Sequence, residues 1–237
     1  MDAVFYPYLI WSILQGSIEA FLSNYTNGNV SFSEVFTLLW APRAQFWFLY
    51  ALFFIFIVCV AVYSLVPKRF SVVVFALTVL LYVLPIVLPD ILIGHYLSQN
   101  LVFFMFGIIF TMYINTDCLS SGWWLSGLLL AFAGGQWLFH DYLSLIYSDR
   151  GPETLLLALA SILFVVACSI YLAKRRYRLL TFIGASSMGI YLMHILASSG
   201  VRVVLNKLGV STYSMHLMLG CFVGILAPLI VIMIINR

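Results

Sequence analysis

Four polar residues near the C-terminus share the spacing of one helical face. Ser187, Tyr191, His194 and Ser198 occupy positions i, i+4, i+7 and i+11 of an apolar segment, which places them on one side of a helix. These four residues are termed the C-terminal stripe. Polar groups inside a hydrocarbon span point to function by default, so these four residues are candidate functional groups. The alternative is a structural histidine that is hydrogen-bonded between helices.

The N-terminal segment repeats this spacing. Tyr8, Ser12, Gln15 and Glu19 also occupy i, i+4, i+7 and i+11, and they are termed the N-terminal stripe. Trp11 lies beside this face. Glu19 is either a functional carboxylate or a carboxylate at the membrane interface. Polar groups inside a hydrocarbon span are costly unless they face a cavity or another helix, so both stripes point to function by default.

The elements that carry these stripes must lie in lipid. Of 237 residues, 64% are hydrophobic and 8% are charged, against roughly a quarter charged in soluble domains. We therefore predict an all-α, polytopic transmembrane helical bundle, with residues 1–237 forming one integral-membrane domain. The net charge of +3 is small and does not suggest nucleic acid as a partner.

Hydropathy predicts about eight transmembrane helices, each of about 20 mostly apolar residues. Their approximate ranges are 4–22, 45–66, 70–88, 99–115, 122–139, 154–173, 180–199 and 213–235. In this assignment His194 lies about 14 residues, or roughly 21 Å, into the seventh helix.

Lys and Arg residues in the short connections predict the orientation. With a cytoplasmic N-terminus, seven basic residues lie inside and four outside. The inner ones are Lys68, Arg69, Lys174, Arg175, Arg176, Arg178 and Arg237, and the outer ones are Arg43, Arg150, Arg202 and Lys207. Both termini are therefore predicted to be cytoplasmic. The Lys174–Arg178 run is either a topology anchor or a binding surface for an anionic headgroup or phosphorylated cofactor.

Three segments together resemble acyltransferase family 3, the integral-membrane enzymes that transfer acetyl or other short acyl groups to sugars. They are Pro7-Tyr-Leu-Ile-Trp-Ser12, Phe46-Trp-Phe-Leu-Tyr-Ala-Leu52 and Gly184-Ala-Ser-Ser-Met-Gly-Ile-Tyr-Leu-Met-His194. Members of this family have about ten spans, and the first span carries a basic residue followed eleven positions later by an essential histidine. An Arg-x-x-Arg motif usually precedes the Pro-Tyr-x-x-Trp-Ser segment. Neither feature is present here, so relative to the family we expect an N-terminal truncation by two helices.

The resemblance implies O-acyl transfer, with acetyl-CoA or another acyl-CoA as co-substrate and no bound cofactor. The acceptor would be a carbohydrate hydroxyl of a cell-surface polysaccharide or glycolipid, in the lipid of a bacterial inner (plasma) membrane. The implied sites are catalytic His194, Tyr191 and Ser187; substrate-lining Tyr8, Trp11, Ser12, Gln15, Glu19 and Trp47; and donor phosphate-binding Arg175 and Arg176. Because the family's leading histidine is missing, His194 is expected to be a supporting base or orienting group. We do not expect the chain as given to be catalytically competent.

Two further expectations concern what the chain lacks. No His, Cys, Asp or Glu pair lies at i, i+3 or i+4 within a span, so no metal site is predicted. The alternative function is that of a non-catalytic multipass protein, such as a transporter or an accessory subunit of polysaccharide export. It would use the same stripes as a permeation path or a helix interface. The oligomeric state is left open.

Overall fold

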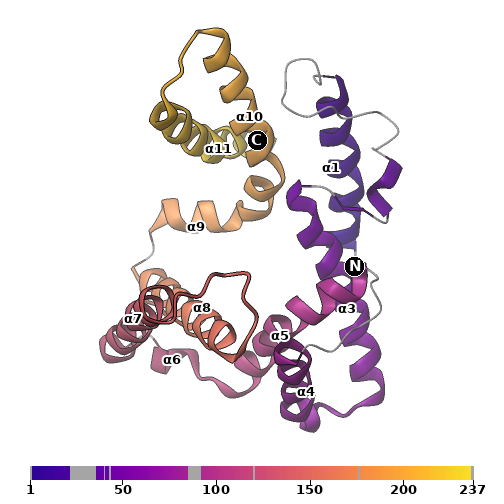
Figure 1. Cartoon of the computed structure of the whole chain (residues 1–237), viewed down its shortest axis with the longest axis vertical. Helices are drawn as coiled ribbons and strands as arrows, with labels where there is room; N and C mark the ends of the chain where they lie inside the picture. The colour runs from indigo at the N-terminus through magenta and orange to yellow at the C-terminus, as the bar shows by residue number, and fades with distance from the viewer. Residues whose placement is uncertain are drawn as a thin grey trace. The chain divides into compact units, whose positions relative to one another are not determined.

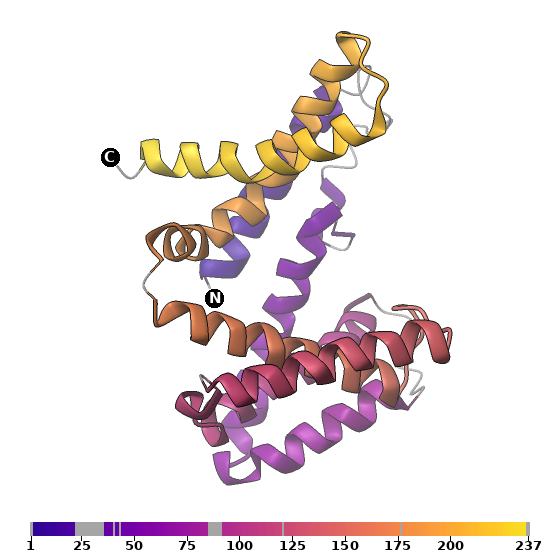
Figure 2. The same ribbon diagram turned by 90° about the vertical axis from the view of Figure 1, so that its left-hand side faces the viewer.

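The computed structural model describes residues 2–21, 36–39, 41–42, 44–84, 92–119, 121–175 and 177–235. These residues form helices and short connections, with no strand among them, which confirms the all-α prediction. The chain divides into two compact units (Figures 1 and 2). Unit 1 comprises Met1–Phe5 and Trp47–Arg176, and unit 2 comprises Tyr6–Phe46 and Tyr177–Arg237.

Unit 1 is built from helices that pack in pairs, most of which are adjacent in sequence. They are α3 (Trp47–Leu65), η4 (Lys68–Phe70), α4 (Ser71–Val83), α5 (Leu92–Tyr113), α6 (Thr116–Leu119), α7 (Gly122–Trp137), the π-helical turn η5 (Leu138–Tyr142) and α8 (Pro152–Ala173). Helix α4 packs on α5, α5 on α3, and α7 on α8. Buried Cys59 of α3 packs with Met105 of α5. Leu155 of α8 joins a second cluster with Tyr82 and Val102, so α5 contributes to both cores.

Proline residues define two breaks between helices in unit 1, the turn at Pro67 before α4 and the start of α8 at Pro152. Pro67 ends the preceding helix, and its carbonyl accepts a bond from the Phe70 amide at 2.9 Å, which closes the tight turn before α4. Pro152 occupies the first turn of α8, where its missing N–H costs no helical hydrogen bond. The first break lies between the predicted spans 45–66 and 70–88, and the second between 122–139 and 154–173.

Unit 2 contains three long helices, two of which carry the candidate site. Its elements are α1 (Asp2–Phe21, of which Asp2–Phe5 belongs to unit 1), η2 (Phe36–Leu39), η3 (Ala44–Phe46), α9 (Arg178–Ala185), α10 (Ser187–Lys207) and α11 (Tyr213–Ile235). Helices α10 and α11 form the most extensive helix pair of the chain. A short connection joins them, in which Gly209 adopts a positive φ of 73° that favours glycine.

Glycine lets α11 approach α10 closely. A Cβ added at Gly224 would lie 2.6 Å from Ser198 Oγ and 3.5 Å from the His194 carbonyl oxygen. A Cβ at Gly189 would lie 2.6 Å from the Cδ1 atom of Ile232. Small residues at helix contacts are typical of membrane helix pairs. They set the separation of the two helices that carry the candidate site.

The predicted count of about eight spans is not supported. Among the described residues, five helices are long and apolar enough to cross a membrane, at Ala44–Leu65, Ile93–Tyr113, Pro152–Ala173, Ser187–Lys207 and Tyr213–Ile235. The N-terminal stripe lowers the hydropathy of α1. Helix α4 spans 13 residues and α7 spans 16 before its π turn, both short of the roughly 20 that a span needs.

The seventh predicted span is also corrected. It is divided at Ser186 into α9 and α10, and α10 then continues to Lys207 instead of ending near residue 199. A glycine and serine run, Gly184 to Ser187, lies at the break, and such pairs are a common cause of helix kinks. His194 is therefore the eighth residue of its helix, about 10 Å along the axis from Ser187.

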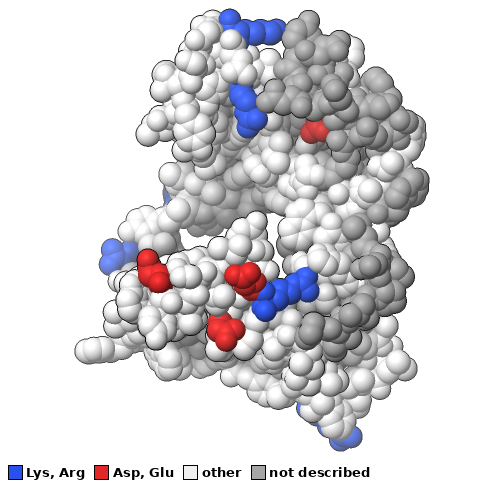
Figure 3. Space-filling model, in the orientation of Figure 1, with Lys and Arg blue, Asp and Glu red and all other residues white. Residues whose placement is uncertain are grey.

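The surface suits lipid. Large apolar side chains are exposed in both units, including Trp123, Tyr147 and Met218, and Lys, Arg, Asp and Glu side chains are sparse on the face shown in Figure 3. A water-soluble protein rarely exposes contiguous apolar surface of this extent. With five apolar helices among the described residues, the chain is an integral membrane protein.

Candidate functional site

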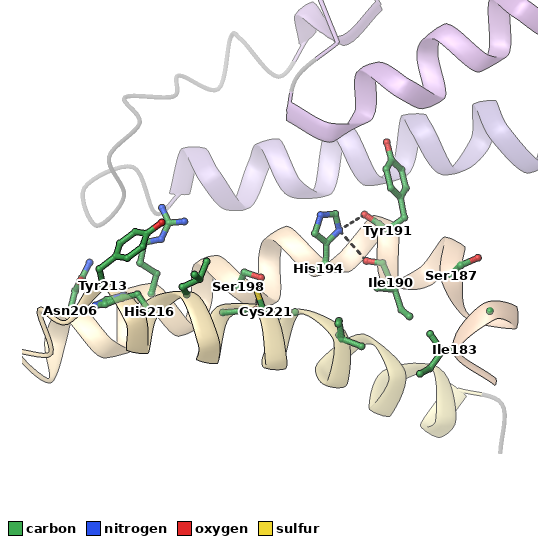
Figure 4. A pocket seen from close by; sticks show the side chains of 16 residues that line it. Ile183, Ser187, Ile190, Tyr191, His194, Ser198, Asn206, Tyr213, His216 and Cys221 are labelled. Carbon is green, nitrogen blue, oxygen red and sulfur yellow. Dashed lines mark hydrogen bonds between the residues drawn. The ribbon is translucent and has the colours of Figure 1, made fainter. Parts of the chain in front are cut away.

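Helices α10 and α11 enclose a groove of about 1050 Å³ within unit 2 (Figure 4). This volume is at the upper end of the range for small-molecule sites. The lining residues are Ile183, Gly184, Ser187, Ile190, Tyr191, His194, Ser198, Arg202, Asn206, Tyr213, His216, Leu217, Gly220, Cys221, Gly224 and Ile225. All four residues of the C-terminal stripe are among them, so the structure brings this stripe together as one wall.

The ring of His194 is held by its own helix. Its Nδ1 atom lies 2.8 Å from the Tyr191 carbonyl oxygen and 3.1 Å from that of Ile190. A carbonyl oxygen can only accept, so Nδ1 must carry the proton that is donated. In the neutral ring this leaves Nε2 with a free lone pair, and Nε2 has no hydrogen-bond partner among the described residues. His194 is thus arranged to accept a proton inside the groove.

The other members of the C-terminal stripe have different roles. Ser187 lies exposed at one end of the groove. Ser198 donates to the Gly220 carbonyl oxygen at 3.0 Å and so ties α10 to α11. The Tyr191 hydroxyl donates to the backbone carbonyl of Gln45 in η3, which leaves its oxygen able to accept.

The N-terminal stripe does not line the groove. It forms a buried chain of amide hydrogen bonds with Gln45, termed the amide relay. Gln45 Nε2 donates to Gln15 Oε1 at 2.9 Å, and Gln15 Nε2 donates to Glu19 Oε1 at 2.9 Å. Because the Glu19 carboxylate only accepts, it fixes the orientation of both amides. Together with the bond from Tyr191, the relay connects the two stripes through one residue, Gln45.

Two buried oxygen atoms near the relay have no partner among the described residues. They are Ser12 Oγ and Gln45 Oε1. The amide orientation set by Glu19 turns Gln45 Oε1 away from Gln15, so this oxygen can be satisfied only by an added donor such as a hydroxyl or a water molecule. Tyr8 and Gln15 are almost fully buried, with 1% and 2% of their surface exposed.

The remaining predicted residues lie outside the groove. Trp11 is half-buried on α1. Trp47 belongs to unit 1, where its ring stacks on Tyr96 at 5.6 Å between centroids. Arg175 also belongs to unit 1, is exposed, and lies with its guanidinium 5.8 Å from the Tyr171 ring centre. Arg176 lies outside the described residues. The predicted roles of these residues stay predictions.

Four polar groove residues were not identified from the sequence. Arg202 and Asn206 continue the C-terminal stripe at i+15 and i+19, while Tyr213 and His216 come from the first turn of α11. Asn206, Tyr213 and His216 lie together at one end of the groove, opposite Ser187 (Figure 4). The continued spacing was a usable signal for the α10 pair. Tyr213 and His216 line the groove only because α11 folds back against α10, and no local spacing indicates that contact.

The groups that the structure describes near the groove are those of an organic ligand site and not of a metal site. No group of three or more His, Cys, Asp or Glu side chains lies together among the residues that the structure describes. The groove lining combines hydroxyl, imidazole, amide and guanidinium groups with apolar walls. Such a lining is suited to an organic substrate that carries both hydroxyl and anionic groups.

Comparison with known proteins identifies one family. The model of the family described as an acyltransferase domain (Acyl_transf_3) matches residues 3–236, which is almost the whole chain. No curated protein and no solved structure matches the chain. The family match confirms the resemblance that the three sequence segments predicted and does not favour the non-catalytic alternative.

Proposed function

Because the chain belongs to acyltransferase family 3, we propose that it transfers an acyl group, with acetyl as the first candidate, from acyl-CoA to a carbohydrate hydroxyl. The acceptor would belong to a cell-surface polysaccharide or glycolipid. The proposed location is a bacterial inner membrane. The prediction of two cytoplasmic termini depends on the eight-span assignment, which the described helices do not support. Family membership supports the reaction class, and the groove supports its site.

The observation that carries this proposal is the state of His194. Nδ1 is bonded to two carbonyl oxygens of α10, and Nε2 is without a partner among described residues in a groove of about 1050 Å³. O-acyl transfer needs a base for the acceptor hydroxyl, since a neutral hydroxyl is a weak nucleophile. A fixed imidazole with one free nitrogen meets that need.

The chemistry follows from these groups. The acceptor oxygen attacks the thioester carbonyl carbon while its proton passes to His194 Nε2. The tetrahedral intermediate then collapses, the C–S bond breaks, and the imidazolium returns the proton to the departing sulfur. The products are an ester and CoA with a free thiol, so the histidine ends in the state in which it began.

Tyr191 and Ser187 would assist through hydrogen bonds. The Tyr191 oxygen can accept from a substrate hydroxyl because its proton is donated to the Gln45 carbonyl. Ser187 is exposed in the groove and can donate or accept. The N-terminal stripe would act indirectly, since the amide relay positions Gln45 and therefore Tyr191.

The test is acyl transfer from labelled acetyl-CoA in membranes that contain the 237-residue chain. His194→Ala is expected to reduce turnover by about 10²- to 10⁴-fold, the usual contribution of a general base. His95→Ala is the matched control, because His95 is exposed in unit 1 and does not line the groove. Its turnover should stay at the wild-type level.

Two outcomes would count against parts of this scheme. Turnover that survives His194→Ala would exclude His194 as the base. Absence of turnover in the wild-type chain would agree with the expectation that the chain as given is not competent. It would also mean that the groove of this chain does not catalyse acyl transfer by itself. Clear turnover would overturn that expectation.

A further inference from the structure

The end of the groove beyond Ser198 carries a cation inside a membrane-spanning helix. Arg202 lines the groove from α10, a candidate membrane span. Arginine within a span is costly unless it is paired or faces a polar cavity, so its presence is a functional signal. Asn206, Tyr213 and His216 line the same end (Figure 4).

Among the residues of unit 2 that the structure describes, no carboxylate forms an ion pair with Arg202. The sequence has no Asp or Glu after Glu153, so all residues of α9, α10 and α11 are free of acids. The described carboxylate of unit 2, Glu19, accepts its hydrogen bond from Gln15. Among the described groove residues, Arg202 is therefore a cation without a counter-charge.

The hairpin between α10 and α11 builds the rest of this end. The Gly209 amide donates to the Asn206 carbonyl at 3.1 Å, and the Val210 amide donates to the Leu205 carbonyl at 3.0 Å. Val210 in turn accepts from His216 Nε2 at 2.8 Å. The backbone thus fixes the His216 ring against the end of α10.

The polar side chains at this end of the groove offer mostly hydrogen-bond donors. His216 Nε2 is used by Val210, so in the neutral ring Nδ1 can accept, and on protonation it becomes a donor. Arg202 offers up to five N–H donors, Asn206 two and Tyr213 one. A planar guanidinium at a groove end that also carries neutral donors matches the oxygen atoms of a phosphate ester.

We propose that the Arg202 end of the groove, with Asn206, Tyr213 and His216, binds a phosphate group of a substrate. This inference rests on the proposed function. It places a phosphate about 12 Å along α10 from His194, eight residues at 1.5 Å each. The phosphate belongs either to acyl-CoA or to a phosphate-bearing glycolipid acceptor, and the shared chemistry is a phosphate ester held by Arg202.

The chain contains its own reporter for a test. Cys221 lines the groove and is exposed, whereas exposed Cys118 lies in unit 1 outside it. The purified full chain in dodecyl maltoside micelles, which contain no phosphate, is treated with a maleimide, and peptide mass spectrometry follows alkylation at the two cysteines. The probes are acetyl-CoA, S-acetylpantetheine (the same acetyl thioester without phosphates), and dihexadecyl phosphate added to the micelles.

A phosphate-bearing probe is expected to slow alkylation at Cys221 and leave Cys118 unchanged. Protection by acetyl-CoA but not by S-acetylpantetheine identifies the donor's phosphates, and protection by dihexadecyl phosphate identifies a phosphate on a lipid-linked acceptor. Arg202→Gln should weaken the protecting probe's apparent affinity roughly ten- to a hundredfold. Arg202→Lys should retain part of it. Lys207→Gln, on the same helix but outside the groove lining, should leave it unchanged.

The proposal is overturned if no phosphate-bearing probe protects Cys221 in the wild-type chain, or if Arg202→Gln is protected as well as the wild type. The first of these outcomes is measured on the wild-type chain with and without each probe, so it does not depend on whether a variant folds. Alkylation also needs no turnover. If acyl transfer is intact and depends on His194 but no probe protects Cys221, the phosphate site is wrong and the proposed reaction stands. If a probe protects Cys221 but no acyl transfer occurs, the phosphate site stands and the proposed reaction fails.

Discussion

The two polar stripes have the same spacing and opposite surroundings. Both place their residues at i, i+4, i+7 and i+11 on long helices. The C-terminal stripe lines an open groove, and His194 keeps one ring nitrogen free there. The N-terminal stripe is closed, with Gln15 fully engaged by Gln45 and Glu19. Helical spacing therefore defines which residues share a face, while the packing of that face decides whether they line a groove or bond to one another.

This difference predicts that the N-terminal stripe contributes to stability more than to chemistry. Gln15→Leu should lower the free energy of unfolding by about 2–3 kcal/mol, because it strands Gln45 Nε2 and removes a donor from Glu19 in a buried site. Gln45→Leu should cost less, since it also removes the unpartnered Gln45 Oε1. Denaturant titration in detergent would measure both. Equal costs for the two variants would mean that the relay is not oriented as described.

The C-terminal stripe should in contrast be sensitive to the separation of its two helices. Gly224→Ala places a Cβ 2.6 Å from Ser198 Oγ, so Ser198 must move and its bond to Gly220 is strained. The expected cost is about 1–2 kcal/mol, which is usual for a methyl forced into a packed contact. Thermal unfolding would measure it.

Gly220→Ala is the matched control, because no atom lies within 4 Å of its added Cβ. It should leave stability unchanged or slightly raised. If Gly220→Ala proved as costly as Gly224→Ala, close helix approach at the groove would not be the cause.

The smallest expected effect concerns proton positions within the groove. His194 bonds a carbonyl through Nδ1, and His216 bonds the Val210 carbonyl through Nε2. In the neutral state the two rings should therefore have opposite tautomers. Nitrogen-15 chemical shifts of labelled histidine, assigned with His194→Ala and His216→Ala, would show them. The same tautomer in both rings would contradict the assignment of Nε2 of His194 as the free base.

Much of the molecule could be predicted from composition and local pattern. The apolar composition required a membrane protein, because water cannot accommodate so much apolar surface. The breaks at Pro67 and Pro152 followed from the missing N–H and fixed φ of proline. The three segments near Pro7, Trp47 and His194 pointed to the family that the comparison identified.

Other features were beyond local pattern. The count of about eight spans was wrong because hydropathy measures apolar runs and not helix length. Leu84 is extended before Pro85, so α4 ends at Val83 although the apolar run continues. Gln45 connects two segments that are 30 and 146 residues away in sequence. No window of neighbouring residues contains that information.

The sequence by itself determined that the chain lies in lipid, which polar residues share a helical face, and which family the chain resembles. Each of these depends on residue type and on spacing within one helix. Only the tertiary structure decided which stripe is open. Gly224 and Gly189 let α11 approach α10 closely, and Gly224 also lines the groove. The amide relay closes the other stripe around Gln15. Both outcomes depend on which helix packs against each face, and that is set by contacts between distant segments.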